Sequence, residues 1–130
     1  ILGHIGDSRT YRLRDGQLEQ LTQDHTLVQQ QLQEGLITSD QAKNHPMRNV
    51  IYRAVGVKEE PTVDLLVGKI CPEDMFLLCS DGLTDMIQDD QIQDILCRDI
   101  DLNQKAESLI ESAKIAGGAD NITVVLVTIT

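Results

Sequence analysis

The sequence predicts an α+β fold, because strand patterns lie at both ends of the chain and helix patterns lie between them. Near the start, an Asp-Gly pair at residues 15–16 separates two alternating segments, 11–14 and 17–21, which indicates a hairpin with a type I′ turn. A continuous apolar run at 75–79 is typical of a buried strand, and residues 122–129 are rich in valine, isoleucine and threonine. We therefore expect a mainly antiparallel sheet whose helices cover one face.

The stretch after the hairpin predicts two short helices and a further strand. Residues 26–34 form the first helical pattern. Thr38 and Gln41 form a capping-box pattern that begins the second helix, and Pro46 ends it because the residue before a proline is driven out of helical geometry. Residues 63–67 then predict a strand.

Two more helices are predicted in the C-terminal third. Residues 89–97 carry apolar side chains at helical spacing, with Asp89 as the expected N-cap. Asn103 is the expected N-cap of the next helix, which ends at Gly117 and Gly118.

The composition limits the classes of partner. The chain has 130 residues and a net charge of −10 at pH 7. An acidic surface of this kind repels nucleic acid and anionic membranes, because proteins bind both largely through positive charge. No apolar run reaches the ~18 residues that span a bilayer, and no basic-then-apolar leader occurs. We expect no nucleic-acid partner and no membrane association.

The cysteines and the first residue carry two smaller expectations. Cys71, Cys79 and Cys97 follow no metal-ligand spacing, so we expect reduced thiols in a cytoplasmic protein. The chain starts with Ile1 inside an apolar run, so we expect further residues upstream of it.

Three aspartates share one local pattern, because each lies at an end of a predicted strand beside a glycine or another small residue. Asp7 closes the first apolar segment. Asp81 follows the strand at 75–79 and Asp120 precedes the strand at 122–129, so antiparallel pairing would bring these two to one edge of the sheet. Carboxylates gathered at an edge repel one another unless a cation lies between them, and Mg²⁺ and Mn²⁺ prefer oxygen ligands. Taken singly, each aspartate could also be a turn or cap residue.

Three segments resemble the C-terminal motifs of the type 2C family of metal-dependent serine/threonine phosphatases, in the family's order and at similar intervals. They are Gly-Asp-Ser-Arg at residues 6–9, Ser-Asp-Gly-Leu-Thr-Asp at 80–85 and Gly-Ala-Asp-Asn-Ile-Thr at 118–123. Residues 11–25 and the His-Pro-Met-Arg-Asn segment at 45–49 resemble the bacterial branch in particular. The resemblance covers essentially the whole chain.

The resemblance implies a two-sheet antiparallel β-sandwich flanked by helices, with two Mg²⁺ or Mn²⁺ ions at one rim and a third, weaker ion in bacterial members. It implies hydrolysis of phosphoserine or phosphothreonine in proteins by a metal-activated water. Asp81 and Asp120 match ligands of the metal centre, and Asp7 matches an aspartate associated with the third ion. No catalytic residue beyond the metal ligands is implied. His45 lies in a flap, at about residues 26–55, that resembles the substrate-influencing loop of the bacterial branch.

The family's N-terminal motifs do not occur in this sequence. We therefore expect the C-terminal portion of a phosphatase catalytic domain, acting on a phosphorylated protein in opposition to a serine/threonine kinase. Alone, the chain is expected to be inactive, and its unpaired strand edges favour dimers or domain swaps. The alternative is a regulatory or binding module that keeps the phosphatase fold without catalysis.

Overall fold

The computed structural model describes residues 1–57 and 59–130, which divide into two compact units. Unit 1 is formed by Ile1–Asp7 and Gln23–Gly68, and unit 2 by Ser8–Thr22 and Lys69–Thr130. Each unit holds an antiparallel sheet and helices of its own, so the α+β prediction is confirmed. No helix among the described residues is both long and apolar enough to cross a membrane.

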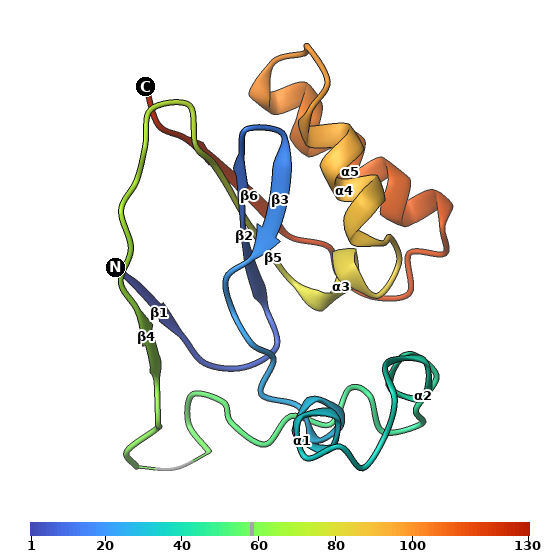
Figure 1. The fold of residues 1–130 in the computed structure, drawn as a ribbon. Helices are drawn as coiled ribbons and strands as arrows, with labels where there is room; N and C mark the ends of the chain where they lie inside the picture. The colour runs from blue at the N-terminus through green and yellow to red at the C-terminus, as the bar shows by residue number, and fades with distance from the viewer. Residues whose placement is uncertain (58) are drawn as a thin grey trace. The chain divides into compact units, whose positions relative to one another are not determined.

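Unit 2 is built on a four-stranded antiparallel sheet in the order β3-β2-β5-β6 (Figure 1). The sheet confirms the predicted hairpin, because Asp15 and Gly16 join its first two strands with φ of 50° and 74°, the positive values of a type I′ turn. The apolar run at 75–79 forms the strand predicted there, in the middle of the sheet, although Leu78 on its outer face is exposed. The four strands are β2 (Arg9–Arg14), β3 (Gln17–Gln20), β5 (Met75–Cys79) and β6 (Val124–Thr128).

Helices cover one face of this sheet. α4 (Asp89–Leu96) and α5 (Leu102–Ile115) pack beside each other against it, with the short α3 (Asp81–Thr84) directly after β5 (Figure 1). Burial of one large apolar side chain contributes roughly 1.5–3 kcal/mol, so the cluster between sheet and helices is the main source of stability in unit 2. Its buried members are Tyr11, Leu13, Met75, Leu77, Cys79, Leu83, Ile87, Ile92, Ile95, Leu96, Leu109 and Ala113.

Both long helices begin at capping boxes, although not at the residues predicted. The N-cap of α4 is Gln88, which forms its capping box with Gln91, and Asp89 is the first helical residue. The N-cap of α5 is Asp101, whose carboxylate accepts the N–H three residues on at 2.9 Å, and Asn103 lies in the first turn. The expectation that Asp89 and Asn103 are N-caps was wrong, because the reciprocal side-chain bond decides where each helix begins.

Unit 1 pairs β1 (Leu2–His4) with β4 (Asp64–Leu66) and carries α1 (Leu27–Gln33) and α2 (Ser39–Lys43). The capping box of Thr38 and Gln41 begins α2, and the helix ends before Pro46, as predicted. Residues 26–55 are all described, and within them Thr26 and Val28 alone are buried. This stretch therefore buries little apolar area.

An ion pair ties β2 to the loop before β5. Asp74 is 1% exposed and accepts hydrogen bonds from Arg14 Nε and Nη2, both at 2.7 Å, and from the Cys71 N–H at 2.8 Å. These bonds, those from Arg14 foremost, lower the pKa of Asp74 to about 2. The pair therefore makes the stability of unit 2 depend on pH.

We expect unit 2 to lose stability as the pH falls from ~4, near the pKa of aspartate in an unfolded chain, towards the folded pKa. A lowered folded pKa gives a contribution that is complete above this window and is lost as Asp74 binds a proton. Urea unfolding midpoints measured across this range should fall for the wild type and fall less for Asp74→Asn, whose amide does not titrate. Equal falls for the two proteins would assign the pH dependence to other carboxylates.

Candidate functional site

Asp81 and Asp120 lie at the same edge of the four-stranded sheet. β5 ends at Cys79, which pairs with Val124, the first residue of β6. Asp81 comes just after the end of β5, and Asp120 comes just before the start of β6. Because the two strands run antiparallel, both aspartates belong to this edge, as the sequence pattern indicated for this pair.

Ser80 joins the two segments that carry these aspartates. Its N–H donates to Thr123 O at 3.1 Å, which continues the β5–β6 ladder beyond the strands. Its hydroxyl donates to Asn121 O at 3.2 Å and accepts from the Thr123 N–H at 3.1 Å. Three hydrogen bonds from one residue thus fix the backbone next to Asp81 against the backbone next to Asp120.

Gly82 brings the same two segments into direct contact on the other side of Asp81. A Cβ at this position would lie 2.1 Å from Asn121 O and 2.8 Å from Asn121 C. Any side chain would therefore overlap the backbone that leads into β6. In the sequence, this glycine is only the small neighbour of Asp81 at the end of a predicted strand. The structure places Gly82 in α3, a helix that was not predicted, and explains the glycine by close backbone approach.

The two carboxylates differ in their surroundings. Asp81 is the first residue of α3 and is half-buried, whereas Asp120 is exposed. Asp120 Oδ1 accepts the N–H of Asn121 at 2.7 Å, which fixes the direction of its carboxylate close to the segment that Gly82 contacts. The edge therefore presents oxygen ligands on a backbone held by hydrogen bonds and by steric contact.

Asp7 belongs to unit 1, where it follows Gly6 at the end of the first segment. Asp81 and Asp120 belong to unit 2, so the predicted gathering of all three aspartates at one rim stays a prediction.

Sequence reasoning missed a polar cluster in unit 1. His25 is 3% exposed, and its Nε2 lies 2.7 Å from Asp64 Oδ2, while Arg53 Nη1 donates to Asp64 Oδ1 at 3.1 Å. The hydrogen bond from His25 is the main cause that lowers the pKa of Asp64, and the charge of Arg53 adds to it. The three residues come from separate segments of the chain, so no local spacing signals the cluster.

His45, the residue predicted to influence substrate, lies just beyond α2. Its Nδ1 accepts the Met47 N–H at 3.0 Å, and its carbonyl accepts the Arg48 N–H at 3.1 Å. The side chain therefore organises the turn at 45–48, and the residues around it are exposed.

Comparison with known proteins finds similar chains among both curated proteins and solved structures. No family model matches the chain. The serine/threonine phosphatase Stp of Listeria welshimeri is 44% identical over 127 residues, which cover 98% of this chain and 50% of that protein. A 2C-type protein phosphatase of Streptococcus pyogenes is 42% identical, with 98% of this chain and 52% of that protein covered.

Solved structures give the same result for the fold. The S. agalactiae serine/threonine phosphatase matches with a TM-score of 0.93 and 37% identity, covering 98% of this chain and 53% of that one. The chain is homologous to the bacterial type 2C phosphatases. The catalytic domain of the serine/threonine phosphatase PstP, solved with two manganese ions, matches with a TM-score of 0.81 and 42% identity over 98% of this chain and 53% of that one. The chain spans about half the length of the type 2C relatives it matches, so their whole activity is not carried over by similarity alone.

The donor chemistry of the edge fits the cations of type 2C phosphatases, whereas the number of ligands is incomplete. Asp81 and Asp120 offer the oxygen ligands that Mg²⁺ and Mn²⁺ take. Within the part of the chain that the structure describes, no three His, Cys, Asp or Glu side chains gather closely enough to hold a metal ion. The edge therefore offers two carboxylates of the kind that bind such cations, and their role as ligands stays a prediction.

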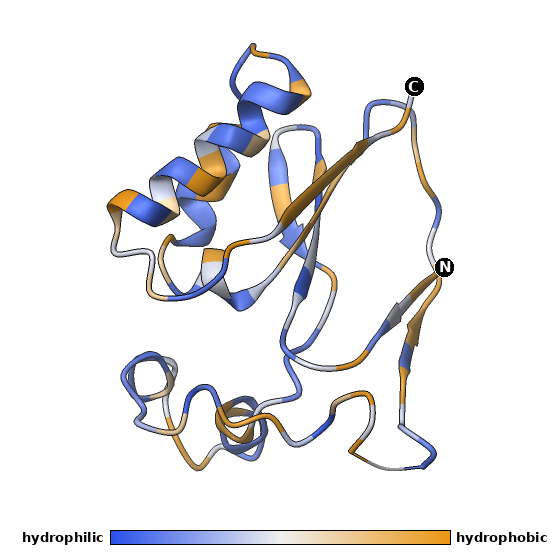
Figure 2. Ribbon diagram, turned by 180° about the vertical axis from the view of Figure 1, so that it is seen from behind, coloured by the Kyte–Doolittle hydropathy of each residue, from blue (hydrophilic) through white to orange (hydrophobic). Residues whose placement is uncertain are grey.

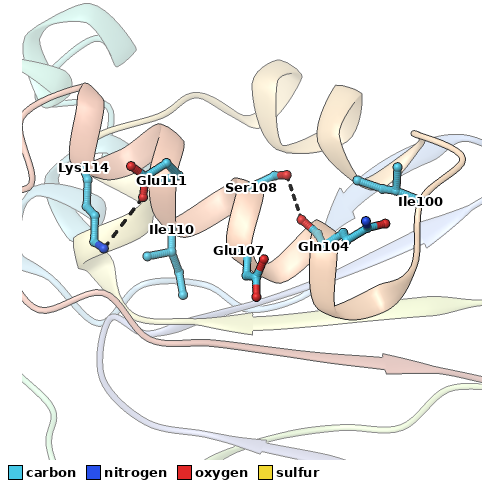
Figure 3. A pocket seen from close by; sticks show the side chains of 7 residues that line it. All are labelled: Ile100, Gln104, Glu107, Ser108, Ile110, Glu111 and Lys114. Atoms are coloured by element: carbon cyan, nitrogen blue, oxygen red, sulfur yellow. Dashed lines mark hydrogen bonds and ion pairs between the residues drawn. The ribbon is translucent and has the colours of Figure 1, made fainter.

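An open groove of about 700 Å³ runs along α5 (Figure 3). Glu107, Glu111 and Lys114 line it, and Lys114 Nζ lies 3.8 Å from Glu111 Oε2 across the helix surface. The groove contains none of the aspartates singled out by the sequence, and we assign no part of the phosphatase site to it.

Gly82→Ala should destabilise unit 2 and loosen the edge that carries Asp81 and Asp120. Overpacking of this kind costs about 1–3 kcal/mol, because the backbone at Asn121 must move to make room for the methyl group. Urea unfolding measures the loss. Gly68→Ala is the matched control, since an added Cβ there meets nothing within 4 Å. Equal stability of the two variants would show that Gly82 is not required by the contact.

Proposed function

We propose that this chain is part of a metal-dependent phosphatase that hydrolyses phosphoserine and phosphothreonine in proteins. The observation that supports it most is the edge of unit 2, where Ser80 and Gly82 hold Asp81 and Asp120 together in a chain 44% identical to a serine/threonine phosphatase. The sequence motifs around these residues resemble those of the family in order and spacing. Unaided hydrolysis of phosphate monoesters is among the slowest biological reactions, so the site must supply strong stabilisation of the reacting charges.

Asp81 and Asp120 would hold Mg²⁺ or Mn²⁺, and Asp7 would contribute to a third, weaker ion. When bound, two such ions would lower the pKa of a water molecule, so that it could lose a proton and attack phosphorus. They would also offset the negative charge on the attacking and leaving oxygens. The role of this chain is to hold the carboxylates at fixed positions. Short aspartate side chains suit it, because they keep their oxygens close to a backbone tied down by Ser80 and Gly82.

We also propose that residues 26–55 form a flap that influences the substrate, with His45 in it. Little of this stretch is buried, and weakly packed segments open at low cost in free energy. His45 would act by shaping the turn at 45–48, since its ring nitrogen already accepts the Met47 N–H.

The substrate and the setting follow from the same proposal. A phosphatase of this class removes phosphate that a serine/threonine kinase has added, so such a kinase is the expected opposing partner. The three cysteines are thiols and form no disulfide, which suits the reducing cytoplasm.

The longer protein that contains this chain should release phosphate from phosphoserine or phosphothreonine peptides with Mn²⁺ or Mg²⁺. Asp81→Asn should lower turnover by at least about 100-fold, because loss of the charge weakens an oxygen ligand on a hard cation. Phosphate release at saturating peptide is the measurement. Asp94→Asn, at an exposed carboxylate on α4, is the matched control and should keep wild-type turnover. Full activity of Asp81→Asn, or activity that survives a chelator, would refute the metal-dependent mechanism. No phosphate release by the wild type would favour the alternative of a non-catalytic binding module.

The chain of residues 1–130 by itself should be a poor phosphatase and should self-associate. Leu78 pairs with Val125 and Phe76 with Val127 on the outer face of β5 and β6, and three of these four side chains are exposed. The hydropathy colouring of Figure 2 shows how apolar β6 is along its length. β6 is also an edge strand, and unpaired edges bind other chains. Light scattering should report dimers or larger species, with turnover on a phosphopeptide far below that of the longer protein. A stable monomer with full turnover would contradict both expectations.

A further inference from the structure

His25 holds three separate segments of unit 1 together from a buried position. Its backbone N–H donates to Gly6 O at 2.8 Å, and the Gly6 N–H donates back to His25 Nδ1 at 3.1 Å. Its carbonyl accepts the Tyr52 N–H at 3.0 Å, and its Nε2 lies 2.7 Å from Asp64 Oδ2. One residue therefore occupies both the donor and the acceptor of Gly6, the residue before Asp7.

The contacts allow one arrangement of protons. Because Nδ1 accepts the Gly6 N–H, the ring proton lies on Nε2 and is donated to Asp64. Arg53 Nη1 is 3.5 Å from the same Nε2, but both are donors, so Arg53 instead donates to Asp64 Oδ1 at 3.1 Å. Asp64 thus orients the ring, and the ring presents its lone pair to Gly6.

The backbone conformation of Gly6 sets the direction in which the chain leads into Asp7. Gly6 has φ of +106°, which side-chain-bearing residues rarely adopt, and no atom within 4 Å would block a Cβ. Its glycine is therefore required by conformation. A turn of this kind needs its polar groups held if it is to point the next residue in a fixed direction.

We propose that His25 is a positioning residue for Asp7, acting through the Gly6 peptide and itself oriented by Asp64 and Arg53. This inference rests on the proposed function, because it treats Asp7 as a ligand of the weaker metal ion. Outer residues that orient a ligand typically change metal affinity by 10–100-fold when they are replaced. His25 would do so through the backbone on which the ligand stands.

Packing alone does not explain these contacts. The neighbouring His4 is also buried, lies 4.8 Å from the His25 ring between centroids, and donates to Gln23 O at 3.0 Å. His4 therefore contributes comparable packing in the same unit through a ring bond that does not involve Gly6. It provides a control for loss of a buried histidine.

Two substitutions separate the two bonds of the ring. His25→Asn places an amide oxygen near the position of Nδ1, so it can accept from Gly6, but it is too short to reach Asp64. His25→Gln can donate to Asp64 but leaves the Gly6 N–H without its ring acceptor. If His25 only filled space or held Asp64, the glutamine variant should bind Mn²⁺ more like the wild type does. The proposal expects the asparagine variant to be the closer of the two.

The test uses the longer phosphatase, at a temperature where every variant is folded. His25→Gln should raise the Mn²⁺ concentration for half-maximal turnover by about tenfold, with a smaller effect on the KM for phosphopeptide, and should speed hydrogen exchange at the Gly6 amide. His25→Asn keeps an acceptor for Gly6 but loses the orienting bond to Asp64, so it should fall between the wild type and His25→Gln in both. His4→Gln should stay within about twofold of wild type. Equal Mn²⁺ dependence of wild type and His25→Gln, or equal losses in the two His25 variants, would overturn the proposal.

Two readouts keep the inference separate from the proposed function. NMR of the wild type should show a scalar coupling across the Gly6 N–H to Nδ1 bond, and calorimetry should detect the weakened Mn²⁺ binding whether or not the protein turns over. No phosphate release by the wild type would remove the proposed function, while these two measurements would still support or refute the role of His25.

If a His25 variant does not fold, Asp64→Ala, at a side chain that is 39% exposed, replaces it. It should also weaken Mn²⁺ binding by freeing the ring, and unchanged binding would count against the proposal.

Discussion

The close approach of Gly82 to Asn121 is the constraint on which the candidate site depends. A Cβ on Gly82 would lie 2.1 Å from Asn121 O, so the first turn of α3 rests directly on the backbone that leads into β6. Ser80 fixes the other side of the same junction with its hydroxyl. The Gly82 contact and the Ser80 hydrogen bonds both act on backbone atoms, so neither uses the carboxylates of Asp81 and Asp120. The edge is therefore defined before any ligand binds.

Further contacts within unit 2 hold its sheet and helices together around this junction. Tyr11 is completely buried, donates its hydroxyl proton to Asp89 Oδ1 at 3.0 Å and accepts from Arg9 Nη1 at 3.1 Å. It thereby links the middle of the sheet to the first turn of α4. Residues 26–55 of unit 1 differ from this packed part of unit 2, because few of their side chains are buried. Weakly packed segments open at a lower cost in free energy than well-packed ones, so the two parts of the chain should differ in mobility.

Local sequence signals predicted much of this fold. The hairpin at residues 15–16, the capping box of Thr38 and the strands that flank the helices depend on neighbouring residues, and the structure confirms them. The common edge of Asp81 and Asp120 followed from the order and direction of two strands. Each of these inferences needed only the residues themselves and the geometry of antiparallel pairing.

The features that the sequence did not reveal depend on contacts between distant segments. The requirement for Gly82 arises from a backbone 39 positions further along the chain, so the residue read only as a turn former. The bonds of His25 to Gly6 and Asp64 likewise join residues far apart in sequence. The misplaced cap at Asn103 has a smaller cause, because Asp101 competes for the same helix start and forms the better reciprocal bond. Propensity ranks such candidates without deciding between them.

The rigidity of the junction gives the paired aspartates an electrostatic consequence. Two carboxylates at one edge of a chain with a net charge of −10 repel each other, and repulsion on a flexible segment would be relieved by moving apart. Ser80 and Gly82 oppose that relief, because separating the segments breaks the hydrogen bonds and the backbone contact together. A cation between the two carboxylates would offset this repulsion. Under the proposed function, a fold that prevents the two segments from separating would favour cation binding through Ser80 and Gly82, which act on the backbone.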